Sequence, residues 1–393
     1  MSDSSRARLL ELGEALDGTL FLPHDEGWIE AASPWNRAIV QRPAAVAVPA
    51  NVADVQRIMH AARDAGLGVT VQPGGHGPHG GDLQDCILIR TSAFDELVID
   101  AAAGTARVGA GVHWGRLLRE LDGTALVALA GSNPTINIVG FTIGGGHSSL
   151  GRTYGLAAHS VLAVEMVTAD GAAVRVTGDG DAELLWALKG GGGQFGVVTA
   201  LEFRLHPAPE GGRLYGGKLT FPAAVAAPVL RAMADVAASA PEPLSISAVM
   251  MVLPDLPVVP EPLRGQQIVT VDIVSQLGRE ATERVIEPIR SAGPVVADTV
   301  AEFGIGALTD VFAEPVDPVP TLEWSALAGT VNHATVDALV GAFVEGAALG
   351  LSLLQIRPLG GAIGRAATPP AVAGVAGVLG AGALLGAAGF VFD

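Results

Sequence analysis

The residues of this chain best suited to chemistry are histidines placed in glycine-rich turns. One turn, Gln72-Pro73-Gly74-Gly75-His76-Gly77, directly follows the apolar run 69–71, and a later one, Gly144-Gly145-Gly146, ends at His147. Histidine can exchange a proton near neutral pH. Glycine permits positive φ angles, and successive bare N–H groups in such turns form concavities that bind anions. A pyrophosphate fits that description.

A third glycine run, 190–193, follows Lys189. No basic side chain other than histidine lies in the first two turns, so backbone N–H groups would do most of the phosphate binding, with Arg152 or Lys189 as helpers. The GxGxxG spacing of dinucleotide-binding folds does not follow any strand cleanly, and the P-loop lysine motif is absent. With 52 glycines in the chain, the order and context of the turns matter more than their number.

The first turn is positioned by a strand, a helix and a second strand. Residues 45–48 form a short apolar run that predicts a strand, and 69–71 predict another. Between them, Asn51 is a favourable helix N-cap, Asp54 suits the positive end of the helix, and Gly66 ends it. The unit therefore runs strand, helix, strand, and then into the turn that contains His76.

A linker at 207–212 divides the rest of the chain into two parts that differ in their order of predicted strands and helices. Before it, we expect strands and helices in alternation: strands at 87–90, 105–108, 160–168, 173–176 and 197–205, and helices at 112–121 and 181–188. After it, we expect strands at 219–221, 245–253 and 268–274, and helices at 229–239, 282–287 and 335–348. The second half therefore reads as an antiparallel sheet with helices on one face.

Six blocks in this order resemble the FAD-binding domain of the vanillyl-alcohol oxidase and p-cresol methylhydroxylase (PCMH) superfamily. Within that superfamily, the sequence pattern most resembles the bacterial branch of the berberine-bridge-enzyme-like, FAD-linked oxidases. The blocks lie at 71–77, 106–112, 131–134 with 139–146, 151–158, 164–171 and 186–198. The resemblance implies an α+β fold, in which a PCMH-type FAD-binding domain of two α/β subdomains precedes a substrate domain with an antiparallel sheet covered by helices. It also implies an N-terminal extension at 1–37, an FAD-binding domain at 38–208 and a substrate domain at 213–393.

The resemblance assigns FAD as the cofactor and His76 as the residue bonded to the flavin 8α-methyl group. Some relatives add a cysteinyl link just before the proline of the third block; here that position is Asn133, so we expect a single link. A turn histidine with an ordinary hydrogen bond is the alternative for His76. The other expected FAD-binding residues are Gln72, Pro73, Gly74, Gly75, Gly77, Gly111, Gly131, Asn133, Pro134, Val139, Gly140, Gly144, Gly145, Gly146, Gly155, Gly196, Val197 and Val198.

Four further residues keep two interpretations each. His147 faces the flavin or substrate, or lies in a solvated turn. His79 is a loop residue without a role in the chemistry, or it helps to deprotonate His76. Arg152 and Tyr154 match family positions near the cofactor, with surface packing as the alternative.

The second half offers two substrate contacts and no catalytic base. The segment 354–362 resembles the central strand of the family's substrate domain. Gln355 and Arg357 share one face of it by the period of two, so either contacts substrate or points to solvent. Hydride transfer from an alcohol or amine needs a proton acceptor, but Tyr154 and Tyr215, the only tyrosines, are not placed for it by sequence. We expect no metal site.

Composition narrows the partners and the compartment. The net charge of −17 argues against nucleic-acid binding and against anionic membrane surfaces. Cys86 is the only cysteine, so the chain forms no internal disulfide. The first 17 residues lack the pattern of a secretory signal, which favours a cytoplasmic protein. The uncharged stretch 366–392 is long enough for a membrane span, but Pro369-Pro370 and its many glycines favour a loop followed by a buried strand at 384–392.

Together these features predict an FAD-dependent oxidase for a small alcohol, sugar or amine, with O2 as the acceptor and H2O2 as a product. The alternatives are a flavin dehydrogenase that uses another acceptor, a flavin-binding protein with impaired catalysis, and a membrane-tethered protein. The second alternative rests on a departure from the family: the chain ends without the C-terminal segment that returns to the flavin domain. The oligomeric state does not follow from the sequence.

Overall fold

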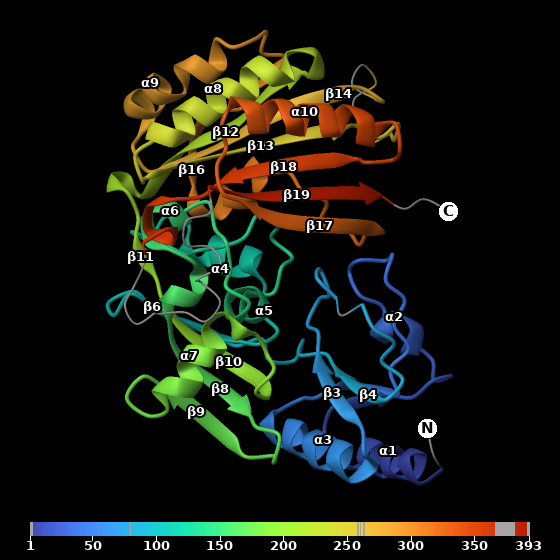
Figure 1. The fold of residues 1–393 in the computed structure, drawn as a ribbon. Coiled ribbons are helices and arrows are strands. Elements are labelled where there is room, and N and C mark those ends of the chain that lie inside the picture. Colours follow the sequence, from blue (N-terminus) through green and yellow to red (C-terminus); the bar gives the residue numbers. More distant parts are fainter. Residues whose placement is uncertain are drawn as a thin grey trace.

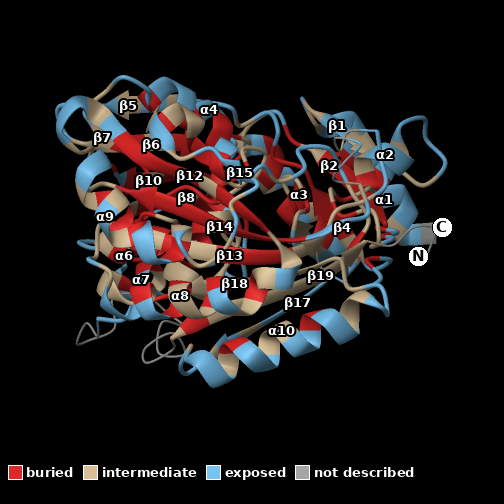
Figure 2. Ribbon diagram, turned by 90° about the horizontal axis from the view of Figure 1, so that it is seen from above, coloured by how far each residue is buried: buried red, intermediate tan, exposed pale blue. Residues whose placement is uncertain are grey.

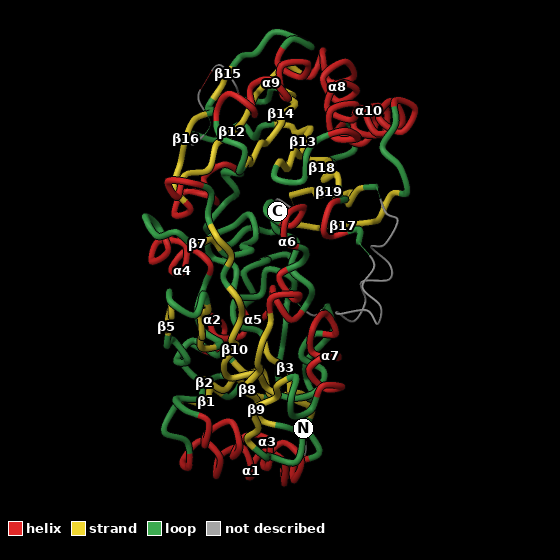
Figure 3. Tube along the Cα trace, turned by 90° about the vertical axis from the view of Figure 1, so that its left-hand side faces the viewer, coloured by secondary structure: helices red, strands yellow, loops and turns green. Residues whose placement is uncertain are grey.

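The computed structural model describes residues 3–78, 80–257, 259, 261, 264–365 and 382–390. His79 and most of the uncharged stretch 366–392 lie outside these residues, so the expectations for His79 and for a membrane tether are not addressed there. An N-terminal region of two subdomains carries a C-terminal region built on one large sheet (Figure 1). The side view shows the two regions stacked along the long dimension of the molecule (Figure 3).

The first subdomain is a four-stranded sheet in the order β1-β2-β4-β3. Strands β2 (Ala45–Val48), β4 (Cys86–Ile89) and β3 (Gly68–Val71) are parallel, and β1 (Thr19–Phe21) joins β2 antiparallel. The sheet is accompanied by α1 (Asp3–Ala15), α2 (Trp28–Ala32) and α3 (Val52–Ala65). Asn51 caps α3 by accepting a hydrogen bond from the N–H of Asp54, and Gly66 ends it at φ +67°. The predicted strand–helix–strand unit is confirmed.

The second subdomain is an antiparallel sheet in the order β5-β6-β10-β8-β9. Its strands are β5 (Leu97–Asp100), β6 (Thr105–Gly109), β10 (Val197–Arg204), β8 (Val161–Val167) and β9 (Ala173–Thr177). Helices α4 (Trp114–Leu121), α5 (Ile138–Ile143), α6 (Gly151–Tyr154) and α7 (Ala182–Gly191) belong to it, and the short strands β7 (Leu126–Val127) and β11 (His206–Pro207) pair beside it. Trp114 is buried at its centre, where the ring of Phe141 meets it edge-on.

The C-terminal region is an eight-stranded antiparallel sheet with the path β15-β12-β14-β13-β18-β19-β17 and β16 paired to β12. Its strands are β12 (Arg213–Pro222), β13 (Leu244–Val252), β14 (Gln267–Ser275), β15 (Ala297–Asp298), β16 (Ala301–Gly304), β17 (Thr321–Ala328), β18 (Leu353–Pro358) and β19 (Ala383–Phe390). Helices α8 (Ala226–Ser239), α9 (Arg279–Arg290) and α10 (His333–Ala347) cover its outer face, and the inner face turns toward the N-terminal region (Figure 1). The predicted α+β architecture is confirmed.

Burial follows this layering. Buried residues run along β12, β13 and β14, while α10 presents exposed residues outward (Figure 2). The expected C-terminal strand is present as β19, between β18 and β17. Only Ala383 of it is buried, however, so the expectation of a fully buried strand was wrong: β19 lies one strand from the sheet edge, where cover is incomplete. None of the described helices is long and apolar enough to cross a membrane.

Candidate functional site

A cavity of about 450 Å³ opens between the two N-terminal subdomains. This volume lies within the range of small-molecule sites. Three glycine-bearing segments line it, and the lining residues are Val71, Gln72, Pro73, Gly74, Gly75, His76, Gly77, Ala110, Ile136, Asn137, Val139, Gly140, Phe141, Ile143, Gly192, Gly193, Gly196 and Val198. Two of the glycine turns that the sequence singled out, 72–77 and 190–193, therefore meet around one cleft, whereas Gly144, Gly145 and Gly146 lie outside its lining.

The glycines of the cleft have two different functions. A Cβ on Gly77 or Gly192 would meet no described atom within 4 Å, so these positions leave bare backbone facing open space. Gly75 is different: at φ +80°, a Cβ there would lie 2.7 Å from the Cβ of Pro34. The turn is therefore pressed against segment 34–36, where Trp35 N–H donates to the carbonyl oxygen of Gly74. Exposed backbone of this kind forms a cradle that suits a phosphate-bearing ligand.

His76 lies in this cleft with its ring held on two sides. The indole of Trp35 stacks on the imidazole, with ring centroids 4.3 Å apart and an interplanar angle of 13°. Nε2 of His76 lies 3.0 Å from Oγ1 of Thr135. Burial and the nearby His113 lower the pKa of His76 to about 4, so the ring is neutral at pH 7.

A directional chain of hydrogen bonds decides which nitrogen of His76 carries the proton. Asn133 Nδ2 donates to the carbonyl oxygen of Pro315 (2.7 Å), which leaves Asn133 Oδ1 as an acceptor. The hydroxyl of Thr135 donates to that Oδ1 (2.7 Å) and has no second hydrogen to give. His76 Nε2–H must then be the donor to Thr135. The lone pair of His76 therefore resides on Nδ1, which no described residue hydrogen-bonds.

The structure separates the expected cofactor residues into two groups. Those lining the cleft are Gln72, Pro73, Gly74, Gly75, His76, Gly77, Val139, Gly140, Gly196 and Val198. Those outside its lining are Gly111, Gly131, Asn133, Pro134, Gly144, Gly145, Gly146, Gly155 and Val197. Several of the second group are sites of close packing: a Cβ on Gly111 would lie 2.5 Å from the carbonyl oxygen of Thr91, and one on Gly146 would lie 2.7 Å from Ala157.

Sequence reasoning missed two residues around His76. Trp35 lies in the segment read as an extension, and nothing in its sequence context marks it as a ring-stacking partner. Thr135 carried a usable signal, because it follows Asn133-Pro134 in the third block. The buried Gln72 was found, and its side chain exchanges two hydrogen bonds with the side chain of Gln41 (2.9 and 3.0 Å).

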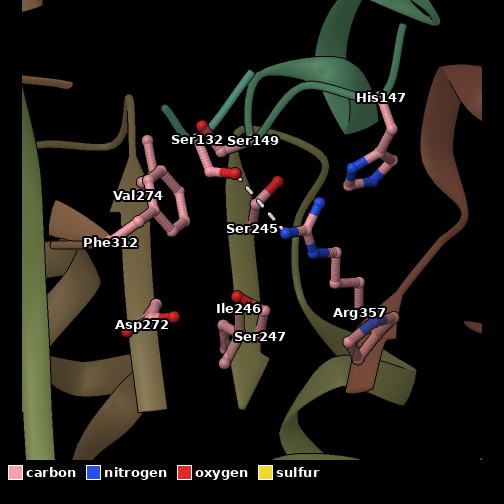
Figure 4. Close-up of a pocket in the computed structure, with 11 residues that line it drawn as sticks. Ser132, His147, Ser149, Ser245, Ile246, Ser247, Asp272, Val274, Phe312 and Arg357 are labelled. Atoms are coloured by element: carbon pink, nitrogen blue, oxygen red, sulfur yellow. Dashed lines mark hydrogen bonds between the residues drawn. The ribbon is translucent and has the colours of Figure 1, made fainter. Parts of the chain in front are cut away.

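A second, smaller pocket of about 30 Å³ lies between the N-terminal region and the inner face of the large sheet. It is lined by Ser132, His147, Ser149, Ser245, Ile246, Ser247, Asp272, Val274, Phe312, Arg357 and Pro358 (Figure 4). Gln355 and Arg357 do share one face of β18, because the residues that alternate with them, Leu354 and Ile356, are buried in the core against the helices. Arg357 reaches the pocket, whereas Gln355 is not among its lining residues.

His147 and Arg357 approach each other from the two regions (Figure 4). Burial and the Arg357 guanidinium lower the pKa of His147 to about 3, so this imidazole is neutral. Among the described residues, the guanidinium of Arg357 makes two long contacts, 3.5 Å to Ser132 Oγ and 3.7 Å to Glu314. His147 therefore lines a pocket between the two regions instead of lying in a solvated turn.

Arg152 and Tyr154 join the regions instead of lining either cavity. The guanidinium of Arg152 donates to the carbonyl oxygens of Leu359 (2.6 Å) and Ala240 (2.9 Å). The hydroxyl of Tyr154 lies 2.8 Å from the carbonyl oxygen of Pro207. The structure thus supports packing for both residues. Tyr215 donates to Glu283 (2.6 Å) and lines neither cavity, so neither tyrosine faces a substrate site.

The comparisons agree with this geometry. A family model described as an FAD-binding domain matches residues 43–177. Among solved structures, 6-hydroxy-D-nicotine oxidase from Arthrobacter nicotinovorans superimposes with a TM-score of 0.78 at 26% identity, covering 96% of this chain and 81% of that one. A berberine-bridge-enzyme-like protein of Physcomitrella patens superimposes with a TM-score of 0.83 at 20% identity, covering 98% and 84%. Residues 43–177 thus match an FAD-binding domain, and the chain shares the fold of the berberine-bridge-enzyme-like proteins.

Curated relatives match over shorter lengths. (R)-6-hydroxynicotine oxidase of Paenarthrobacter nicotinovorans is 31% identical over 288 residues, which are 73% of this chain and 61% of the relative. Glucooligosaccharide oxidase of Sarocladium strictum is 30% identical over 189 residues, 47% of this chain and 38% of the relative. The matched part of this chain therefore spans less than two thirds of either relative. The residues present still fit FAD, because bare backbone lines the cleft and a neutral imidazole faces it.

Proposed function

We propose that the protein is an FAD-dependent oxidase. In this proposal, residues 38–208 bind FAD and residues 213–393 bind a small alcohol, sugar or amine. When bound, FAD accepts a hydride from a substrate C–H bond next to oxygen or nitrogen and passes the electrons to O2, giving H2O2. The observation that carries the proposal is the position of His76 in a cleft lined by glycine backbone. Two relatives named as oxidases support O2 as the acceptor.

The FAD is proposed to be covalently attached to His76 by one bond. The hydrogen-bond chain through Thr135 and Asn133 presents Nδ1 with its lone pair, which is the atom needed to form a C–N bond. In the net reaction a C–N bond replaces one 8α-methyl C–H bond and the imidazole N–H bond, and O2 takes up the two hydrogens as H2O2. Asn133 has no thiol and its amide is engaged with Thr135 and Pro315, so a second link is not formed.

Acid denaturation tests this proposal. Protein expressed with its natural flavin supply is precipitated in acid, washed and digested. We expect flavin absorbance to remain on the peptide that contains His76. A colourless pellet would refute the covalent bond, and a wild-type protein without any bound flavin would refute the whole proposal. Peroxide release, measured across a panel of alcohols, sugars and amines, then separates an oxidase from a dehydrogenase.

A further inference from the structure

Residues 313–321 of the C-terminal region reach the N-terminal region beside His76, and we call this segment the strap. Near its start, the carboxylate of Glu314 lies 3.7 Å from the guanidinium of Arg357 on β18. Its last residue, Thr321, is the first residue of β17. Both ends of the strap are therefore connected to the large sheet, while the residues between them contact the N-terminal region.

Asn36 fastens the strap at its far end. Its side chain is 6% exposed, Nδ2 donates to the carbonyl oxygen of Thr321 (2.9 Å), and Oδ1 accepts from the Thr321 N–H (3.1 Å). The amide thus pairs with the backbone of Thr321 as a neighbouring strand would. One residue on, the Arg37 N–H donates to the carbonyl oxygen of Val319 (3.0 Å). Because a buried polar group without a partner costs free energy, these bonds fix the position of the strap.

The same N-terminal segment also holds the turn that contains His76. The backbone N–H of Trp35 donates to the carbonyl oxygen of Gly74 (2.9 Å), and that of Asn36 donates to Gly75 (3.1 Å). The indole of Trp35 stacks on the imidazole of His76. Residues 35–36 therefore lie between the strap and the turn and are hydrogen-bonded to both.

Two adjacent carbonyl groups of the strap hold the two side chains that orient His76. The carbonyl oxygen of Val316 accepts from Nε1–H of Trp35 (3.2 Å), whose ring lies against the imidazole. The carbonyl oxygen of Pro315 accepts from Nδ2 of Asn133 (2.7 Å), which begins the hydrogen-bond chain that ends at His76 Nε2. The ring plane and the tautomer of His76 thus depend on the same two residues of the strap.

The strap begins at a strained residue. Ala313 has a φ of +52°, and His24 is the only other described non-glycine residue with a positive φ. Such a conformation costs free energy and persists where the surrounding contacts impose it. Because Ala313 is exposed, packing of its own side chain does not impose this angle. The strap therefore follows a path set by the contacts of the residues that follow Ala313.

We infer that the strap positions His76 for flavin attachment, so that docking of the C-terminal region prepares the imidazole before the C–N bond forms. This inference rests on the proposed covalent bond and adds residues that act through His76. In it, Asn36 and Trp35 are positioning residues for the ring, and Asn133 is a positioning residue for its proton.

The strap changes the preparation of His76 and leaves the bond-forming reaction as given above, with O2 as the oxidant. Without the Pro315 carbonyl, the amide of Asn133 is free to turn and Thr135 can donate to His76 or accept from it. The imidazole proton is then shared between Nδ1 and Nε2, and fewer molecules present the Nδ1 lone pair. We therefore expect attachment to follow docking of the two regions.

Two full-length variants displace the strap without changing a residue that contacts His76. Asn36→Asp keeps the shape of the side chain but sets an oxygen against the carbonyl oxygen of Thr321. Ala313→Val places a branched side chain at a φ of +52°, which such residues avoid. Ala313→Gly accepts that angle and is the matched control.

Mixing each apoprotein with FAD separates binding from attachment. Quenching of flavin fluorescence gives the Kd of unattached FAD, and acid-stable absorbance over time gives the rate constant of attachment at saturating FAD. We expect Asn36→Asp and Ala313→Val to lower that rate constant by about tenfold, as loss of an orienting hydrogen bond does elsewhere. The Kd should stay unchanged, because no strap residue lines the cleft. Ala313→Gly should attach FAD at the wild-type rate.

¹⁵N NMR of the apoproteins gives a readout that general destabilisation does not move. Wild-type protein and Ala313→Gly should show His76 protonated on Nε2, whereas Asn36→Asp and Ala313→Val should also show the Nδ1–H form. Val336→Ala, a buried residue between α10 and the outer face of the sheet, is the stability control. It should keep both the tautomer and the attachment rate of the wild type.

The outcomes separate this inference from the covalent bond itself. Attachment at the wild-type rate with an unchanged tautomer in both strap variants would overturn the role of the strap and leave the covalent bond in place. An equal slowing in Val336→Ala would overturn it too, because the effect would then be one of stability. Wild-type protein without acid-stable flavin overturns the covalent bond, while the NMR spectra still decide the strap. If Asn36→Asp does not fold, Ala313→Val decides alone, since its side chain lies at an exposed position.

Discussion

The cleft around His76 and the inner face of the large sheet are built in opposite ways. The cleft presents glycine backbone and a neutral imidazole, whereas the sheet presents charged side chains on neighbouring strands, such as the pair Lys218 and Asp272 on β12 and β14. Backbone N–H groups suit a ligand whose phosphates never change. Side chains can be exchanged without altering the sheet, because register and the apolar outer face stay the same. Under the proposed function, we therefore expect the constant cofactor to be recognised by backbone and the substrate by side chains.

The largest expected effect is on flavin attachment. His76→Ala should remove all flavin that survives acid denaturation, because Nδ1 is the only atom proposed to bond it. His113→Ala is the matched control, since it removes a second imidazole close to His76 and leaves Nδ1 of His76 in place. Absorbance of the washed, denatured protein measures both variants. Covalent flavin in the His76→Ala protein would place the bond elsewhere.

The two kinds of cleft glycine should respond differently to substitution. Gly75→Val should destabilise the protein by about 3 kcal/mol, because φ is +80° and the new Cβ would lie 2.7 Å from Pro34. Gly77→Ala should change the free energy of unfolding by less than about 0.5 kcal/mol, because no described atom lies within 4 Å of the added methyl. It should nevertheless lower flavin content, since the methyl enters the cleft. Urea unfolding and flavin absorbance separate the two effects; equal stability of the two variants would contradict this division.

The hydrogen-bond chain at His76 should affect the rate of attachment more than its final extent. Thr135→Val removes the acceptor for Nε2–H and lets the proton move to Nδ1, so attachment of FAD to apoprotein should slow by about tenfold. Thr135→Ser keeps the hydroxyl and should attach at nearly the wild-type rate. ¹⁵N NMR of the apoprotein reports the His76 tautomer directly. An Nδ1–H tautomer of His76 in the wild type would refute the proposed chain of hydrogen bonds, even if FAD becomes attached.

Low pH should reduce folding stability through histidines in both regions, and this is the smallest of the four expected effects. Folding lowers the pKa of His76 to about 4 and of His147 to about 3, below the ordinary value of 6.5. The unfolded chain therefore binds more protons in this range, and stability falls as the pH drops from about 6.5 toward 4. His147→Asn should flatten that fall in urea-denaturation midpoints, whereas exposed His24→Asn should leave it unchanged. A urea-denaturation midpoint that is constant between pH 7 and pH 4.5 would contradict the lowered pKa values of His76 and His147.

The sequence predicted features that are local in the chain. Asn51 and Gly66 bound a helix through contacts within a few residues, and the His76 turn is continuous in sequence. The polar side chains on the inner face of the large sheet are different, because Lys218, Asp272 and Arg357 are up to 139 positions apart and are brought together only through strand register. Trp35 was missed for the same reason: its stacking on His76 depends on segment 34–36 folding back against the turn. Of Lys218, Asp272 and Arg357, the sequence identified only Arg357, through the alternation of residues along one strand.

The stacking of Trp35 on His76 has a practical consequence for observing the protein. An indole 4.3 Å from the ring that faces the cleft lies within range for efficient energy transfer to a bound isoalloxazine. The emission of Trp35 should therefore be extinguished as FAD enters. A Trp35→Phe protein would supply the baseline. The chain thus contains its own optical reporter of cofactor loading, readable in real time and without a label.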